Sequence, residues 1–273
     1  PGVLHVNTLP PRAYFIPYDS EEAALSGERE RSDYFRSLDG DWSFGYFDSV
    51  HRLDAALLEK DFCLSALPTI PVPGLWQLYG YDAPQYTNVK YPFPCDPPYV
   101  PNENPAGVYL RDFTFKKPAG KRCILNFEGV DSCFYIYING AFAGYSQVSH
   151  MPSEFDVTDL LHDGANRIAV VVLKWCDGSY LEDQDKWRLS GIFRSVYLLI
   201  RDEVRVEDVF IKTPLSGDLS SARVDCSITL NGEAEVRCRL LSPEGRPLGE
   251  KAARVAGQGT ISFDLASPAL WTA

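Results

Sequence analysis

The chain has 273 residues, of which 45% are hydrophobic and 23% are charged, a composition typical of folded globular proteins rather than disordered ones. This length exceeds one small domain and fits a β-sandwich of about 150 to 200 residues followed by part of another. The formal net charge of −11 argues against nucleic acid or an anionic membrane as partner, because both are bound mainly through Lys and Arg. The sequence has no apolar run approaching the roughly 18 residues that a membrane helix needs.

The seven cysteines are widely spaced and include neither a Cys-x-x-Cys zinc pattern nor a redox pair of that spacing. Several lie inside apolar runs, as Cys123 and Cys133 do, which is typical of buried free thiols. We therefore predict a reducing, cytoplasmic compartment, with a set of structural disulfides as the less favoured alternative. The chain begins Pro-Gly-Val, without Met or a signal segment, so we expect it to be part of a longer protein.

The predicted elements begin after a polar, proline-punctuated stretch, residues 1–35, which we interpret as an extended arm. A first strand is predicted at residues 37–47, where apolar and smaller residues alternate after an Asp-Gly turn. Residues 76–105 are rich in Pro, Tyr and Gly and lack hydrophobic periodicity, which predicts a long loop of the kind that compact domains keep for function. Within this loop Asn88 offers a donor and an acceptor to a vicinal diol, but its spacing alone favours a turn-capping asparagine.

Short apolar or alternating segments joined by tight turns predict an antiparallel sandwich in jelly-roll order over residues 36–203. Asn139-Gly140 is a strong hairpin signal. Residues 155–161 fit either a helical turn or an edge strand, and residues 167–175 are apolar on both alternating faces, which predicts a strand buried from both sides. The strands of this domain are predicted at residues 107–115, 122–127, 133–140, 141–145, 167–175 and 195–200.

After residue 203 the composition shifts, and we predict a separate domain at residues 204–273. Asn231-Gly232 predicts a further hairpin within it. About four strands are expected, which is fewer than the seven or so of an immunoglobulin-like sandwich, so we predict a partial immunoglobulin-like domain. These strands are predicted at residues 206–212, 222–230, 234–241 and 260–265. The expected fold class is therefore all-β.

Residues 177–193 lie between two apolar runs and hold three acids within four residues, Glu182, Asp183 and Asp185. An isolated buried carboxylate would take up a proton, so these acids are solvated, paired with a cation, or directed at a polyhydroxyl ligand. A solvated turn is the common outcome for such a run. An aromatic face beside carboxylate oxygens, however, is suited to binding a sugar ring. Three aromatic residues are interspersed with the acids: Tyr180, Trp187 and Phe193.

Six motifs spread over nearly the whole chain resemble the N-terminal part of β-galactosidases of glycoside hydrolase family 2: residues 76–89, 103–107, 144–147, 152–156, 177–194 and 268–271. The longest reads Asp-Gly-Ser-Tyr-Leu-Glu-Asp-Gln-Asp-Lys-Trp-Arg-Leu-Ser-Gly-Ile-Phe-Arg. The resemblance implies a jelly-roll sugar-binding domain and an immunoglobulin-like domain, which precede a (β/α)₈ barrel with the two catalytic glutamates of a retaining hydrolase. It also implies a homo-oligomeric parent enzyme that hydrolyses terminal β-galactosides such as lactose.

We assign no catalytic residue to this chain, because none of its segments shows the strand–helix alternation of a barrel. Retaining hydrolysis needs two carboxyl groups roughly 5 to 5.5 Å apart across the scissile bond, whereas neighbours on one segment approach a substrate from the same side. The barrel is expected in polypeptide outside this chain, and the chain alone is expected to bind galactose weakly and to hydrolyse nothing. The alternative is a free-standing carbohydrate-binding or interaction module without hydrolase activity.

The resemblance carries sugar-binding roles to two residues. Asp185 matches the aspartate that, in these enzymes, contacts the galactosyl hydroxyls and ligates a sodium ion. Asn88 matches the asparagine that hydrogen-bonds the same sugar ring. This chemistry is consistent, because a hard cation with oxygen ligands accepts a carboxylate and a sugar hydroxyl together.

Supporting roles are expected for neighbouring residues. We expect Glu182 and Asp183 to pair with Arg188 or Arg194, and we expect Trp187 and Arg188 to pack as scaffold. The four histidines have no metal-ligand spacing and are expected to be structural: His5, His51, His150 and His162.

The resemblance also implies a magnesium site. Gln147 and Asp177 match positions that ligate Mg²⁺ in some relatives, together with the backbone at the position of Val3 and acidic or amide side chains just before it. Those preceding residues are absent from this sequence, so we expect the site to be vacant or defective in this chain. Sodium is thus the expected cofactor, whereas the magnesium site is expected to be incomplete in this chain.

Overall fold

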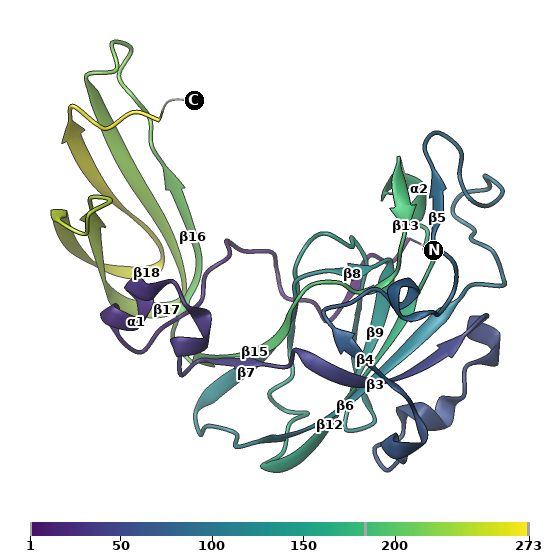
Figure 1. Ribbon diagram of the computed structural model, residues 1–273. Helices are drawn as coiled ribbons and strands as arrows, with labels where there is room; N and C mark the ends of the chain where they lie inside the picture. The colour runs from purple at the N-terminus through teal and green to yellow at the C-terminus, as the bar shows by residue number, and fades with distance from the viewer. Residues whose placement is uncertain (1, 183–184, 272–273) are drawn as a thin grey trace. The chain divides into compact units, whose positions relative to one another are not determined.

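The computed structural model describes residues 2–182 and 185–271. The chain is built mainly of β-strands (Figure 1), which confirms the predicted all-β class. Among the described residues, no helix is long and apolar enough to cross a membrane. The predicted boundaries after residues 35 and 203, and the jelly-roll and immunoglobulin-like descriptions, stay predictions. The chain divides into two compact units, the first comprising residues 1–11 and 16–201 and the second residues 12–15 and 202–273.

The first unit contains a seven-stranded sheet with the strand order β1-β10-β9-β12-β6-β3-β4. On β12, Ile168 and Val170 point into the main core, while Ala169 and Val171 pack in a second apolar cluster on the opposite face. The strand is therefore buried from both sides, as its sequence predicts. The strands are β1 His5–Val6, β3 Gly40–Phe47, β4 Thr69–Val72, β6 Ala106–Phe115, β9 Cys133–Ile138, β10 Ala141–Ser146 and β12 Gly164–Leu173.

A four-stranded sheet, in the order β11-β7-β15-β2, covers the other side of the main core. The two sheets meet through aromatic side chains, since the ring of Phe127 on β7 lies 4.9 Å from that of Phe134 on β9. Phe155, which is fully buried, lies on the edge strand β11, whereas residues 158–160 form a turn in which the Leu161 amide donates to the Val157 carbonyl at 3.2 Å, so each interpretation holds for part of this segment. The strands are β2 Phe35–Ser37, β7 Lys121–Phe127, β11 Ser153–Asp156 and β15 Val196–Asp202.

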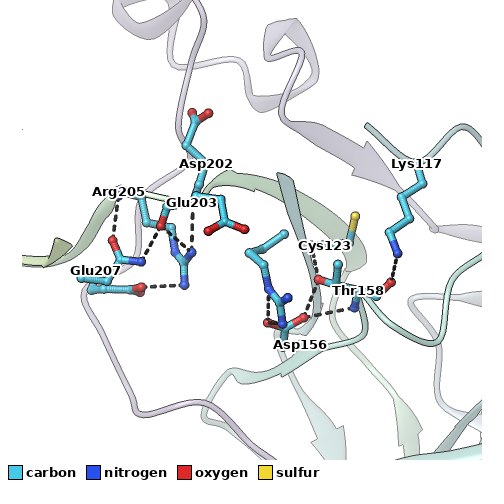
Figure 2. A network of polar contacts seen from close by, with 10 residues as sticks. Lys117, Cys123, Asp156, Thr158, Asp202, Glu203, Arg205 and Glu207 are labelled. Atoms are coloured by element: carbon cyan, nitrogen blue, oxygen red, sulfur yellow. Dashed lines mark hydrogen bonds and ion pairs between the residues drawn. The ribbon is translucent and has the colours of Figure 1, made fainter. Parts of the chain in front are cut away.

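A polar network closes the turn after β11 (Figure 2). Asp156 accepts hydrogen bonds from the backbone and hydroxyl of Thr158, at 3.1 and 2.5 Å, and from Arg122 at 2.6 Å. Thr158 Oγ1 accepts from the backbone amide of Cys123 at 2.8 Å, and the Thr158 carbonyl accepts from Lys117. The network thus provides hydrogen-bond partners for backbone groups at the point where the chain leaves the sheet.

Asn139 and Gly140 form the tight turn between β9 and β10, with φ of 52° and 81°. Two positive φ angles are what this hairpin turn requires, so the predicted hairpin is confirmed. The remaining elements of the first unit are short: α1 Glu21–Ser26, α2 Ser179–Glu182, β5 Gln85–Thr87, β8 Val130–Asp131, β13 Lys186–Arg188, β14 Gly191–Ile192, and the 3₁₀ segments Arg29–Arg31, Val50–Arg52, Ala55–Leu58, Leu64–Ala66 and Trp76–Tyr79.

The second unit is a three-stranded sheet with the order β16-β17-β18. The predicted hairpin at Asn231-Gly232 is wrong, because β17 runs through these residues with only a break in its register. Asn231 instead exchanges hydrogen bonds with the segment before β16, accepting from the Arg205 amide at 2.8 Å and donating to the Glu203 carbonyl. Arg205 also pairs with Glu207 (Figure 2). The strands are β16 Val206–Lys212, β17 Ser221–Leu241 and β18 Pro247–Ala266.

Candidate sugar-binding site

Asn88 and Asp185 lie opposite each other at one end of a small two-stranded sheet, each one residue beyond its strand. Strands β5 and β13 are antiparallel, with Thr87 paired to Lys186, and the Asp185 amide donates to the Asn88 carbonyl at 3.0 Å. Asp185 has φ of 49°, a conformation that Asp tolerates better than most residues. The structure therefore brings together two residues that are 97 positions apart in the sequence (185 minus 88).

One buried cation and one partly buried cation hold this small sheet in place. Arg188, which is 2% exposed, donates to the Lys186 carbonyl at 2.8 Å and to Thr87 Oγ1 at 2.8 Å. It thereby ties β13 to β5, as its expected scaffold role requires. The Lys186 ammonium donates to Asp131 at 2.8 Å. Charge-assisted bonds in such half-buried positions are stronger than neutral ones, so they fix where Asp185 lies.

The carboxylate of Asp185 is held by a residue that the sequence analysis did not single out. Tyr86 donates its hydroxyl to Asp185 Oδ1 at 2.6 Å, and this bond raises the pKa of the tyrosine. Trp187, the cross-strand partner of Tyr86, packs its ring 5.6 Å from the tyrosine ring. Trp187 is 59% exposed, and its ring contact with Tyr86 gives it the packing role that was expected, at the surface. The only sequence signal for Tyr86 was its place one residue before Thr87-Asn88 in the functional loop.

Asn88 is exposed, and its side-chain oxygen accepts from the Val89 amide at 2.7 Å. This bond reaches only the next residue, whereas a capping asparagine accepts from an amide two or three residues further on, so the capping interpretation stays a prediction. The bond engages one lone pair of the amide oxygen, and the amide group also carries two donors on nitrogen. This bond therefore orients Asn88 without exhausting its capacity to bind a ligand.

Glu182, the other acid of the loop that the structure describes, has different partners from Asp185. Glu182 accepts from both the backbone amide and the hydroxyl of Ser149, at 3.1 and 2.9 Å. The expected pairing of Glu182 with an arginine is therefore wrong, because Arg194 donates to the carbonyl of His150 and Arg188 is directed to β5. The expectation for Asp183 lies outside the described residues.

Aromatic side chains order the long loop that carries Asn88. Tyr180 donates to the Tyr99 carbonyl at 2.6 Å, and Tyr91 donates to the Tyr180 carbonyl at 2.7 Å. The ring of Phe93 lies 5.1 Å from Trp175 and 5.4 Å from Tyr180, edge to face. These contacts connect the loop to the end of β12 and to α2, so both halves of the candidate site share one support.

Gln147 and Asp177 also come together, beside the backbone of Val3. Gln147 Nε2 donates to Asp177 Oδ1 at 2.7 Å and to the Val3 carbonyl at 3.0 Å. Burial alone would raise the pKa of Asp177, but bonds from the Gly2 amide, from Gln147 and from the Gly178 amide outweigh it and lower the pKa. The carboxylate therefore stays ionised at neutral pH.

These groups fit a hard cation. Turning the Gln147 amide over would exchange its nitrogen and oxygen, which places three kinds of oxygen ligand together. Within the residues that the structure describes, no group of three His, Cys, Asp or Glu side chains could hold a metal ion. A magnesium ion at this place would therefore depend on the amide and backbone oxygens.

Comparison with known proteins gives the family of this chain. Residues 35–202 match the family model described as glycosyl hydrolases family 2, sugar binding domain. The chain is 51% identical to a β-galactosidase of Actinobacillus pleuropneumoniae over 246 residues, which are 90% of this chain and 24% of the relative. It is 45% identical to a β-galactosidase of Staphylococcus xylosus over 273 residues, which are 99% of this chain and 27% of the relative. The chain thus spans about a quarter of the length of these curated relatives.

Solved structures are similar in fold. A Bifidobacterium dentium β-glucuronidase complexed with coumarin-3-O-glucuronide matches with a TM-score of 0.69 at 21% identity, over 88% of this chain and 43% of that one. A β-glucuronidase from an uncultured Clostridium species matches with a TM-score of 0.65 at 19% identity, over 87% of this chain and 40% of that one. At this identity the likeness concerns the fold alone. The family match, which covers more than half of the chain, shows that the chain belongs to glycoside hydrolase family 2 and contains its sugar-binding domain.

Proposed function

We propose that this chain is the N-terminal, sugar-binding portion of a retaining β-galactosidase that hydrolyses terminal β-D-galactosides such as lactose. The observation that carries the proposal is the 51% and 45% identity to β-galactosidases, combined with the placement of Asn88 opposite Asp185. The structural likeness to β-glucuronidases does not weigh against galactoside specificity, because it lies near 20% identity and extends to fold only.

The chain contributes binding, and the reacting carboxyl groups come from the barrel of the parent protein. Retaining hydrolysis needs two carboxyls facing each other across the scissile bond. Glu182, the described neighbour of Asp185 on the same loop, is engaged by both donors of Ser149 and is directed away from such a role. No residue of this chain is therefore assigned to bond breaking.

Asp185 and Asn88 orient the galactosyl ring in this proposal. Tyr86 occupies Asp185 Oδ1, which leaves Oδ2 directed to sugar hydroxyls or to a sodium ion. Asn88 donates from its amide nitrogen to a neighbouring hydroxyl. The exposed ring of Trp187 supplies an apolar face beside these polar groups. Fixing the ring in one orientation lowers the entropic cost of the reaction at the barrel.

Two cations belong to the proposal. Sodium binds at Asp185, where it supplies positive charge beside the sugar hydroxyls. For magnesium, Gln147 and Asp177 with the Val3 carbonyl supply part of a site that is incomplete in this chain, and their bonds join the N-terminal backbone to the segment after β12. We further propose that the parent enzyme is a homo-oligomer and that it is cytoplasmic, and the cytoplasmic location is supported by seven cysteines that are all free in the structure.

The test uses the parent protein with Asp185→Asn and Asn88→Ala, each compared with Asp218→Asn. Asp218 is an exposed acid of the second unit that is bonded to Ser216 and Ser220, so its substitution controls for the loss of a surface charge. Loss of a charge-assisted bond to the sugar lowers kcat/KM for a chromogenic β-galactoside by about 10- to 100-fold. The control retains full activity.

Equal activity of all three variants would refute the proposed site. No turnover of β-galactosides by the unaltered parent protein, with weak galactose binding by residues 1–273 alone, would favour a carbohydrate-binding module instead. The isolated chain is expected to bind galactose weakly and to hydrolyse no galactoside, because it holds one wall of the pocket.

A further inference from the structure

Strands β17 and β18 form a long hairpin that folds back on itself. Lys251, in the first half of β18, donates its ammonium to the carbonyl of Ser262 in the second half. The same ammonium lies 5.5 Å from the centre of the Phe263 ring. A Cβ added at Gly249 would come within 3.0 Å of that ring. These contacts place the two halves of the hairpin face to face, as two layers over one small core.

Cys226 and Cys238 face this core from opposite layers. Cys226 lies on the same alternating face as the buried residues Val224 and Ile228, and both cysteines pack against the core cluster of the second unit. Cys226 pairs with Ile261 across the hairpin, and Cys238 pairs with Lys251. Because Lys251 is bonded to Ser262, the neighbour of Ile261, the two cysteine-bearing pairs lie directly over each other.

The two thiols interact with each other, since each affects the pKa of the other. Both residues are of intermediate exposure, in contrast to Cys123, Cys133 and Cys176, which are buried. Burial raises the pKa of each thiol, so both are mainly protonated at neutral pH and react slowly on their own. Cys133 and Cys176 also share one cluster but are buried, so proximity combined with partial exposure is what distinguishes the pair Cys226 and Cys238.

We propose that Cys226 and Cys238 form a dithiol site that hydroperoxides convert into a disulfide between the two layers. One sulfur attacks a peroxide oxygen, the O–O bond breaks, and a sulfenic acid and one water form. The second sulfur then attacks the sulfenic sulfur, the S–O bond breaks, the S–S bond forms, and a second water leaves. The two sulfurs lose two electrons in total, and these electrons reduce hydrogen peroxide to two molecules of water. Thiol reductants reverse the step by exchange.

The disulfide would link positions that are 12 residues apart (238 minus 226) and would hold the folded-back hairpin together. A cross-link over a loop of this size lowers the unfolded fraction of the second unit by about 100-fold. This effect does not depend on the proposed enzymatic function, because neither cysteine lies in the first unit.

The experiment oxidises the unaltered 273-residue chain with one equivalent of hydrogen peroxide, blocks free thiols with N-ethylmaleimide and maps peptides by mass spectrometry without reduction. The expected result is a Cys226–Cys238 cross-link, with free thiols falling from seven to five. Dithiothreitol restores all seven. Cys238→Ala abolishes the cross-link, and Cys95→Ala, at an exposed cysteine, leaves it unchanged.

Three outcomes would overturn the proposal. One is a cross-link that joins Cys133 to Cys176 in place of the predicted pair. Another is the recovery of both Cys226 and Cys238 as free thiols while Cys63 or Cys95 is oxidised. The third is a cross-link at the predicted pair that leaves the urea midpoint of the second unit unchanged. The peptide map is made on the unaltered chain, so it decides the matter even if a variant fails to fold.

Discussion

Thr87→Val removes one hydroxyl from the support of the candidate site and leaves the side-chain shape unchanged. Thr87 Oγ1 accepts from Arg188 Nη2 at 2.8 Å, and Arg188 is 2% exposed. A hydrogen bond from a buried cation contributes about 1.5 to 3 kcal/mol. The same nitrogen still donates a hydrogen bond to the Thr87 carbonyl at 3.3 Å, and this bond offsets part of the loss. We therefore expect the pairing of β5 with β13 to weaken by about 1 to 2 kcal/mol.

Native-state hydrogen exchange measures this weakening directly. The Asp185 amide donates to the Asn88 carbonyl across the strand pair, so it exchanges only when the pair opens. A loss of about 1 to 2 kcal/mol speeds its exchange by about 5- to 30-fold. Thr260→Val is the matched control, because Thr260 lies in the second unit and its hydroxyl makes a longer, exposed contact with Ser227 at 3.4 Å.

The control variant is expected to leave Asp185 exchange unchanged. Unaltered exchange in Thr87→Val as well would refute the reasoning, since Arg188 would then not hold the two strands together. Faster exchange throughout the first unit would also contradict it, because the effect is expected to be confined to this strand pair.

Two further predictions concern the fold. Gly107→Ala places a Cβ 2.8 Å from the buried ring of Trp76, so it is expected to lower the free energy of unfolding in urea by about 1 to 3 kcal/mol. Burial raises the pKa of Asp156, but bonds from Thr158 and Arg122 outweigh it and lower the pKa below 3.8. The stability that Asp156 contributes is therefore complete above that value and is lost as the pH falls through the folded-state pKa. Asp156→Asn should lose less stability than the unaltered chain between about pH 5 and about pH 2.

Local sequence patterns predict the sheet elements well where the signal depends on neighbouring residues. The unbroken apolar run of β12 indicates burial on both faces, and the structure places it between two apolar clusters. Asn139-Gly140 forms a turn with two positive φ angles, and the distant bonds of the Asn139 side chain, to Leu160, Asn166 and Arg167, are compatible with that turn. Asn231-Gly232 has the same composition, but its side chain bonds to Arg205 and Glu203, and the strand continues. That competing partner is 26 residues away in the sequence and leaves no local signal.

In the candidate site, too, local sequence signals were predictable and contacts between distant residues were not. The motifs identify Asn88 and Asp185, while their juxtaposition depends on the pairing of β5 with β13, which spans about 100 residues. Tyr86 was missed because an exposed aromatic residue in a loop has no periodicity to mark it, and its partner Asp185 is 99 residues away. The partner of Glu182 was predicted from charge alone, whereas two donors of Ser149 satisfy the carboxylate without a cation.

The central claim is that Asn88 and Asp185 bind one galactosyl ring together. A double-mutant cycle of Asn88→Ala and Asp185→Asn in the parent protein, read as kcat/KM for a β-galactoside, tests it most directly. We predict that the double variant loses less than the sum of the single losses, by about 0.5 to 3 kcal/mol, because both residues contact one ligand. Losses that add to within about 0.3 kcal/mol would show two independent residues and would contradict the claim.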